Sequence, residues 1–262
     1  MLFRSFIVRF VPFLGLLVVY DSFRSIADDL NHYVNYLPMI RFDEFIGFGH
    51  LPTVVLQSLL WHGHLNWYDF YFYFLYTIHF LVPVIFGLIL WKYRPKLYWP
   101  FVFSFVVLSF AAFITYIAFP AAPPWMAAQL GYITEPLHRI SSDVWYAMGI
   151  TNFSEVYGNL SPNEVAAVPS LHSAYPLLAT MFMITAFGFK RVWWLLIYPI
   201  SMWIGVVYLG EHYVFDVIAA IVYVLITYVA TMRFYRWYNQ PTRRLKRWID
   251  RWLVKLHLST SI

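Results

Sequence analysis

The stretch Tyr98–Phe119 reads YWPFVFSFVVLSFAAFITYIAF, and none of its 22 residues is charged. An α-helix rises about 1.5 Å per residue, and the hydrocarbon core of a bilayer is about 30 Å thick. A helix over these residues is therefore long enough and apolar enough to cross a membrane. This stretch predicts an integral membrane protein.

The composition of the whole chain favours the same class. Of its 262 residues, 61% are apolar and only 12% are charged, against about 25% in an ordinary soluble domain. So few charges cannot cover the surface that a soluble protein exposes to water. The composition excludes a soluble globular domain, a disordered chain and a nucleic-acid-binding protein. The absence of cysteine excludes disulfides and thiolate chemistry.

Further apolar runs are long enough to cross, or nearly so: Phe6–Tyr20, Phe70–Trp91, Leu171–Phe189, Val192–Leu209 and Tyr213–Met232. No small-residue cleavage site follows the first run, so we expect an anchor rather than a signal peptide. The sequence thus predicts an all-α bundle of six transmembrane helices, with residues 1–262 forming a single membrane domain. The run Leu51–Trp61, with 11 residues, is too short to span and is expected to be interfacial or re-entrant.

The basic residues predict the orientation of this bundle. With the N-terminus inside, 15 of the 18 Lys and Arg fall in the inner segments or in the first turn of the first span. An excess of Lys and Arg on the cytoplasmic side is the positive-inside pattern. We therefore expect both termini in the cytoplasm and the long segments 21–69 and 120–170 on the outer face.

Residues 233–262 are expected to form a basic cytoplasmic tail. Beyond Gln240, apolar residues recur at helical spacing among Arg and Lys: Leu245, Trp248, Trp252 and Leu256. This pattern predicts an amphipathic helix on the inner leaflet, and the alternative is a basic tail in solvent.

The motif Gly210-Glu211-His212-Tyr213-Val214-Phe215-Asp216 opens the last predicted span. A spacing of four puts His212 and Asp216 on one face of a helix. A carboxylate bonded to one imidazole nitrogen fixes the tautomer and makes the other nitrogen a better nucleophile. The alternative is a capped helix start with a histidine at the membrane edge.

The motif Val168-Pro169-Ser170-Leu171-His172-Ser173 opens the fourth predicted span. Its Pro-Ser pair is typical of a helix start, where backbone N–H groups can bind an anion. Ser170 would add a hydroxyl and His172 a proton, and the alternative is a plain Ser cap with an interfacial histidine. Because both histidines fall at outer ends of different spans, the two motifs together favour one site on the outer face.

A third motif, Phe119-Pro120-Ala121-Ala122-Pro123-Pro124-Trp125, follows the span with which we began. By itself it predicts a helix terminator, then a stiff extended turn with a tryptophan anchored at the interface.

The three motifs, in this order and topology, resemble the type-2 phosphatidic acid phosphatase superfamily over roughly residues 110–220. The forms Pro169–Ser173, Phe119–Trp125 and His212-Tyr213 resemble its branch that contains inositol phosphorylceramide synthase. The resemblance implies that His212 is the nucleophile, that Asp216 orients it and that His172 is the acid–base. It also implies that Ser170 and nearby N–H groups hold phosphate oxygens, and it makes Tyr213 and Trp125 candidate substrate-binding residues.

The chain departs from that superfamily where phosphate-binding cations are expected. Gly205 and Val206 stand where the common third motif has Ser-Arg, and Leu171 replaces a glycine of the second motif. The Lys and Arg-Pro of the first motif are not seen on the outer side, because Lys92-Tyr93-Arg94-Pro95 is on the inner face and too compact.

A phosphoryl transition state needs positive charge or donors on its equatorial oxygens. The outer side offers only Arg24, Arg41 and Arg139 besides histidines. We expect Arg139 first and Arg24 second to bind phosphate, the alternative for each being an ordinary surface arginine. Glu211 and Glu164 would bind an acceptor alcohol or lie in solvent.

These residues predict a membrane lipid phosphotransferase that moves a phospho-head-group between lipids, or to an alcohol, through a phosphohistidine. With water as acceptor the same chemistry makes a lipid phosphate phosphatase, and a lipid transporter or binding protein is the alternative from another class. His62-Gly63-His64 lacks further ligands, so we expect no metal and no other cofactor. The expected partners are a phospholipid or lipid-phosphate substrate, an acceptor and the membrane, most simply a prokaryotic cell membrane.

Overall fold

The computed structural model describes residue 15, residues 30–151 and residues 163–239. Apart from isolated bridges, the regular structure of these residues is helical. Three helical runs are long and apolar enough to cross a membrane: α7 (Pro95–Ala118), the run Phe189–Tyr208 and most of α14 (Val214–Asn239). The predicted all-α membrane architecture is confirmed at this level.

The predicted span Phe70–Trp91 is not one continuous helix. It consists of α5 (Trp67–Thr77) and α6 (Leu81–Tyr93), which are bent by 57° and together make a fourth candidate span. Pro83 explains the break, because its ring excludes the carbonyl of His79, four residues earlier, from a continuing helix. In the first turn of α6 the same proline is harmless, since no N–H is needed there. The break places His79 at the bend.

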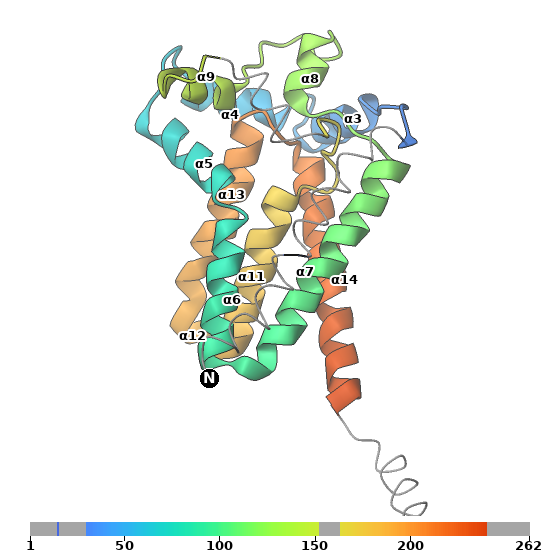
Figure 1. The fold of residues 1–262 in the computed structure, drawn as a ribbon. Coiled ribbons are helices and arrows are strands. Elements are labelled where there is room, and N and C mark those ends of the chain that lie inside the picture. Colours follow the sequence, from blue (N-terminus) through green and yellow to red (C-terminus); the bar gives the residue numbers. More distant parts are fainter. Residues whose placement is uncertain (1–14, 16–29, 152–162, 240–262) are drawn as a thin grey trace, which may run out of the picture.

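The helix α11 (Leu171–Phe187) lies in the middle of the bundle, between α6, α7, α13 and α14 (Figure 1). It is apolar but has 17 residues, fewer than the roughly 20 needed to cross a bilayer. Most of its side chains are buried, on every side of the helix. An all-round apolar sequence is what a helix surrounded by other helices requires.

Three or four candidate spans in the described residues are fewer than the six that we predicted. The first predicted span, Phe6–Tyr20, lies almost wholly outside the described residues. The fifth is present as α12 (Phe189–Val192), the 3-10 turn η1 (Trp193–Leu196) and α13 (Ile197–Tyr208). The basic tail was predicted to start at residue 233, but α14 continues to Asn239. Residues 240–262 are outside the described part of the chain.

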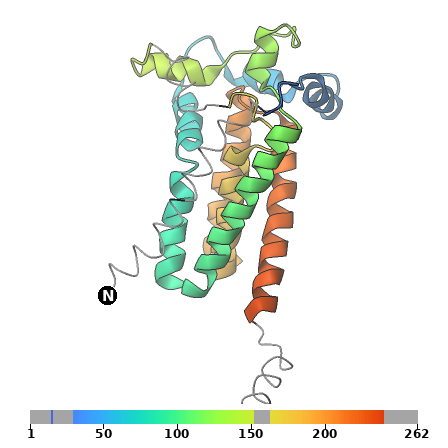
Figure 2. The same ribbon diagram turned by 45° about the vertical axis from the view of Figure 1, so that its right-hand side comes forward.

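Four short helices form a layer across one end of the bundle, here called the capping layer (Figures 1 and 2). They are α3 (Leu37–Ile46), α4 (Pro52–Leu60), α8 (Pro124–Gln129) and α9 (Ile140–Ala147). Within it, α4 corresponds to the run Leu51–Trp61, which we expected not to cross. Basic residues gather at the opposite end, where the long helices are joined or finish: Lys92, Arg94, Lys96, Lys190, Arg191, Arg233 and Arg236.

A buried carboxylate attaches the capping layer to α14. Asp43 of α3 is fully buried, and its two oxygens each accept a backbone N–H at 2.9 Å, from Val214 and Phe215. These N–H groups belong to the first turn of α14 and have no partner within the helix. Asp43 therefore caps α14 from a residue 171 positions earlier in the chain.

Burial raises the pKa of Asp43 to about 7, although the two backbone hydrogen bonds oppose this change. Because the folded-state pKa lies above the ordinary value near 4, the contribution of Asp43 to stability falls as the pH rises from about 4 to about 7. We expect wild-type protein to lose stability relative to Asp43→Asn over this range, by on the order of a few kcal/mol. Thermal unfolding of both proteins in detergent, from about pH 4.5 to 8, measures the difference. A constant difference across that range would contradict this prediction.

Candidate active site

The turn between α13 and α14 positions His212. Gly210 has φ +80, and a Cβ at this residue would lie 2.8 Å from the carbonyl oxygen of His138, so only glycine fits. The N–H groups of Glu211 and His212 both donate to Val206 O at 3.1 Å. This compact turn fixes His212 just before the first residue of α14.

Asp216 holds His212 at the start of α14. Its Oδ2 accepts the N–H of Tyr213 at 2.9 Å and lies 3.1 Å from His212 Nδ1. A carboxylate only accepts, so this contact places the hydrogen on Nδ1 and leaves Nε2 with its lone pair. Asp216 is fully buried and His212 nearly so. The predicted pairing of these two residues four apart is confirmed.

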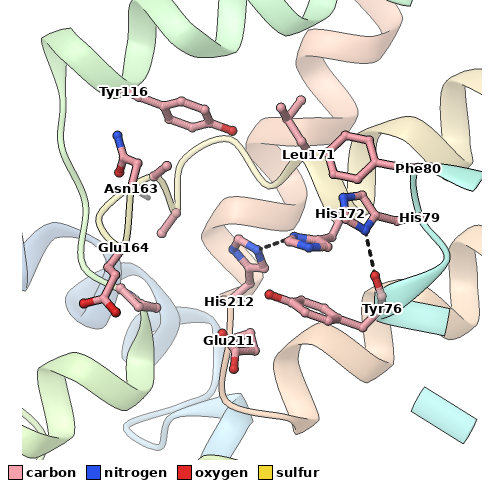
Figure 3. A pocket seen from close by; sticks show the side chains of 13 residues that line it. Tyr76, His79, Phe80, Tyr116, Asn163, Glu164, Leu171, His172, Glu211 and His212 are labelled. Carbon is pink, nitrogen blue, oxygen red and sulfur yellow. Dashed lines mark hydrogen bonds between the residues drawn. The ribbon is translucent and has the colours of Figure 1, made fainter. Parts of the chain in front are cut away.

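His172 approaches from the first turn of α11 (Figure 3). Ser170 caps that helix, because its Oγ accepts the N–H of Ser173 at 3.3 Å. His172 Nδ1 then lies 3.3 Å from His212 Nε2, and the planes of the two rings are inclined by 53°. The carboxylate and the two imidazoles thus form a continuous line, Asp216–His212–His172, across the start of two helices.

Extended segments beside these helices keep the two starts together. Ala121 N donates to Val165 O at 2.7 Å, and Ala122 N donates to Asn35 O at 3.0 Å. Ala121 thus pairs on both sides, with Asn35 and with Ala166. The prolines of Phe119–Trp125 predicted an extended turn, and this pairing was not predicted. Tyr116 of α7 donates its hydroxyl to Pro169 O at 2.9 Å, which fixes the residues just before α11.

A pocket opens onto the two histidines (Figure 3). Its polar lining consists of imidazoles, carboxylates, an amide and phenols, and the remaining residues are apolar. The lining residues are Tyr76, His79, Phe80, Tyr116, Pro123, Asn163, Glu164, Ala166, Ala167, Leu171, His172, Glu211 and His212. No lysine or arginine is among them. Within the residues that the structure describes, no group of three or more His, Asp or Glu is arranged to hold a metal ion.

Arg139 pairs with Glu211 beside this pocket. Its Nε donates to Glu211 Oε1 at 2.9 Å, and its guanidinium lies 3.7 Å from the centre of the Trp125 ring. Ser141 Oγ donates to the same carboxylate. A phosphate contact by Arg139, which we expected first, would therefore have to compete with a largely buried ion pair.

The other expected binding residues fall in different places. Tyr213 is buried among apolar residues of the capping layer and does not line the pocket. Trp125 is buried beneath Arg139 rather than anchored at an interface. Arg41 lies exposed on α3, and Arg24 is outside the described residues.

Sequence reasoning missed His79, which lines the pocket from the break between α5 and α6. Its ring centre lies 4.0 Å from that of His172. Val206, which stands where the third motif of the superfamily has arginine, is fully buried in an apolar cluster. A Cβ on Gly205 would lie 2.9 Å from Phe72, so this position serves close packing of α13 on α5.

Comparisons with known proteins show the family of the chain. Residues 37–230 match the PAP2 superfamily. A phosphoinositol dihydroceramide synthase of Bacteroides thetaiotaomicron is 33% identical over 151 residues, covering 53% of this chain and 48% of that protein. An inositol phosphorylceramide synthase of Candida albicans is 31% identical over 157 residues, covering 54% of this chain and 31% of that protein. The aligned part is thus at most about half of these relatives, and no solved structure matches the chain significantly.

The ion pair of Arg139 and Glu211 gives a prediction on stability. Arg139→Ala leaves the Glu211 carboxylate buried without its cation, and we expect a loss of about 3 kcal/mol. Adding Glu211→Gln removes the buried charge and keeps an acceptor for Ser141, so the double variant should recover most of that loss. Thermal unfolding in detergent measures both variants. Equal unfolding of Arg139→Ala and wild type would contradict the structural role of the pair.

Proposed function

The chain belongs to the PAP2 superfamily, and from that premise we propose that it is a membrane lipid phosphotransferase working through a phosphohistidine. The observation that carries the proposal is the hydrogen-bonded line Asp216–His212–His172 at the pocket wall. A carboxylate, a nucleophilic imidazole and a second imidazole within reach are the groups that such a transfer requires.

In the first step, His212 Nε2 attacks the phosphorus of the donor lipid. Asp216 keeps the hydrogen on Nδ1 and stabilises the positive charge that the ring gains as the N–P bond forms. The P–O bond to the lipid alcohol breaks, and His172 gives that oxygen its proton. Because in-line attack needs phosphorus close to Nε2, the phosphoryl group must take the place of His172 in the 3.3 Å contact.

In the second step, His172 accepts a proton from the hydroxyl of the acceptor. The acceptor oxygen attacks phosphorus, the N–P bond to His212 breaks, and the new phosphodiester leaves. The N-terminus of α11 lies at the pocket. The N–H groups of its first turn and the positive end of the helix dipole therefore support binding of the phosphoryl oxygens there. We expected Ser170 to bind phosphate oxygens at this helix start, whereas in the structure its Oγ accepts the N–H of Ser173 as the helix cap.

We propose a phosphoinositol lipid as donor and a ceramide or dihydroceramide as acceptor, because the names of both curated relatives point to these lipids. The carboxyl and amide groups of Asn163, Glu164 and Glu211 line the same pocket and suit a head group rich in hydroxyls. With water in the acceptor position the same two steps would release the phosphorylated head group, and with a lipid phosphate as donor they would release phosphate, as in a lipid phosphatase.

We further propose that the pocket faces the outer side of a prokaryotic cell membrane. The seven described basic residues at the far end of the bundle, from Lys92 to Arg236, support a cytoplasmic location for that end. The capping layer and the pocket lie at the other end.

The acceptor is tested with the purified full-length protein in lipid vesicles that contain a head-group-labelled phosphoinositol lipid, with and without ceramide. Thin-layer chromatography then separates the products. A new labelled lipid that forms only with ceramide supports the transferase, whereas label released into water shows that water is the acceptor. Lipid binding without any turnover would favour a transporter or binding protein.

His212 and His172 should differ in how strongly their loss affects turnover. We expect His212→Ala to abolish transfer, since it removes the attacking nitrogen, and His172→Ala to slow it by roughly 10² to 10⁴-fold. The matched control is His62→Ala, because His62 is exposed and outside the pocket. The proposed mechanism fails if His212→Ala retains wild-type turnover on every lipid phosphate tested.

A further inference from the structure

We propose that His79 is a third histidine of this site, and that it binds the phosphoryl oxygens of the substrate as the missing cation. The inference rests on the proposed phosphoryl transfer and adds the residue that replaces the absent arginine. It starts from the position of His79, a buried polar side chain that lines the pocket beside His172.

The break between α5 and α6 creates this position. In a continuous helix over Phe70–Trp91, His79 would be one residue of a transmembrane helix among apolar neighbours. Pro83 instead ends the first helix, and the bend of 57° brings His79 to the pocket wall. A buried ionisable group at a helix break in a membrane protein marks a functional site more often than a packing site.

One nitrogen of His79 is already assigned by its contact with the backbone. Nδ1 lies 2.7 Å from the carbonyl oxygen of Tyr76, and a carbonyl only accepts, so Nδ1 carries a hydrogen. The second nitrogen, Nε2, is then the atom that a proton would convert into a donor. An anion bound in the pocket favours that protonated form, and a protonated imidazole makes charge-assisted hydrogen bonds to phosphate.

Among the residues that the structure describes, the other candidates for this role are engaged elsewhere, are replaced, or lie outside the pocket lining as Arg41 does. The pocket lining holds no lysine or arginine. Arg139 is engaged with Glu211 and Trp125. Val206, which stands where the superfamily has arginine, is buried in an apolar cluster. The histidines are therefore the groups in the described pocket that can carry positive charge.

His79 also packs against His172, and this contact needs to be separated from phosphate binding. The His172 ring contacts both Tyr76 and His79, and the centre of each of these rings lies 4.0 Å from its own. Phenylalanine at position 79 preserves a ring against His172 and removes both nitrogens. Glutamine preserves a neutral donor. The two variants thus separate packing, hydrogen bonding and charge.

The experiment measures binding of orthovanadate, an analogue of the transferring phosphoryl group, to the full-length protein in detergent by titration calorimetry. We expect His79→Phe to bind at least about 10-fold more weakly than wild type and His79→Gln to fall between them, since a charged hydrogen bond is lost. The matched control, His62→Gln, should bind like wild type. Thermal unfolding and gel filtration verify that each variant is folded, and His79→Gln carries the test if His79→Phe is not.

Wild-type affinity in either folded His79 variant would overturn the inference, even if lipid transfer is intact. Wild-type protein that binds no orthovanadate would overturn it as well. Lipid turnover then decides the separate question of the proposed function, which stands if wild type transfers the head group and fails if it does not.

Discussion

The beginning of α14 at Val214 is the constraint on which the site depends. His212 precedes this residue and Asp216 follows it, so their 3.1 Å hydrogen bond exists only if the helix starts there. The N–H groups of Val214 and Phe215 are accepted by Asp43, and that of Tyr213 by Asp216. Two buried carboxylates thus define one helix terminus, one from within α14 and one from the capping layer.

The capping layer holds the turn before this helix in the same way. Gln57 of α4 donates to the carbonyl oxygens of His138 and Tyr208 at 2.8 Å and accepts the N–H of His138 at 2.9 Å. One buried side chain thereby joins α4, the residues before α9 and the end of α13. An amide with several backbone partners is difficult to replace, because each lost partner leaves a buried polar group unsatisfied. The short helices therefore act as the support of the site rather than as mere connections.

Local patterns in the sequence were enough to predict the parts of the site that are close together in the chain. The pair His212 and Asp216 is readable because a spacing of four has one meaning on a helix. Ser170 and His172 are readable because helix starts have a recognisable sequence. The apolar runs likewise predicted the three or four candidate spans found in the described residues, but not the bend at His79, because run length ignores the single proline that causes it. Pro83 was the available signal.

Pairings over long sequence separations were not predictable in this way. Arg139 and Glu211 are 72 residues apart, and Asp43 and Val214 are 171 apart, so neither pair leaves a local pattern. The consequence for function is specific. Arg139 was expected to bind phosphate because of a charge count along the chain, whereas the fold uses its guanidinium to neutralise a buried carboxylate. A count of charges says which charged groups lie on one side of a membrane. Only the packing decides which of them are already paired with a buried partner and which can bind a substrate.

That distinction explains why histidines suit this pocket. A buried arginine would keep its charge at all times and would need a permanent partner, as Arg139 has in Glu211. An imidazole, in contrast, can exist in a neutral form and in a protonated form, and a bound anion favours the protonated form. His79, His172 and His212 lie side by side at ring-centre distances of 4.0 and 5.4 Å, a spacing that three permanent cations could not tolerate.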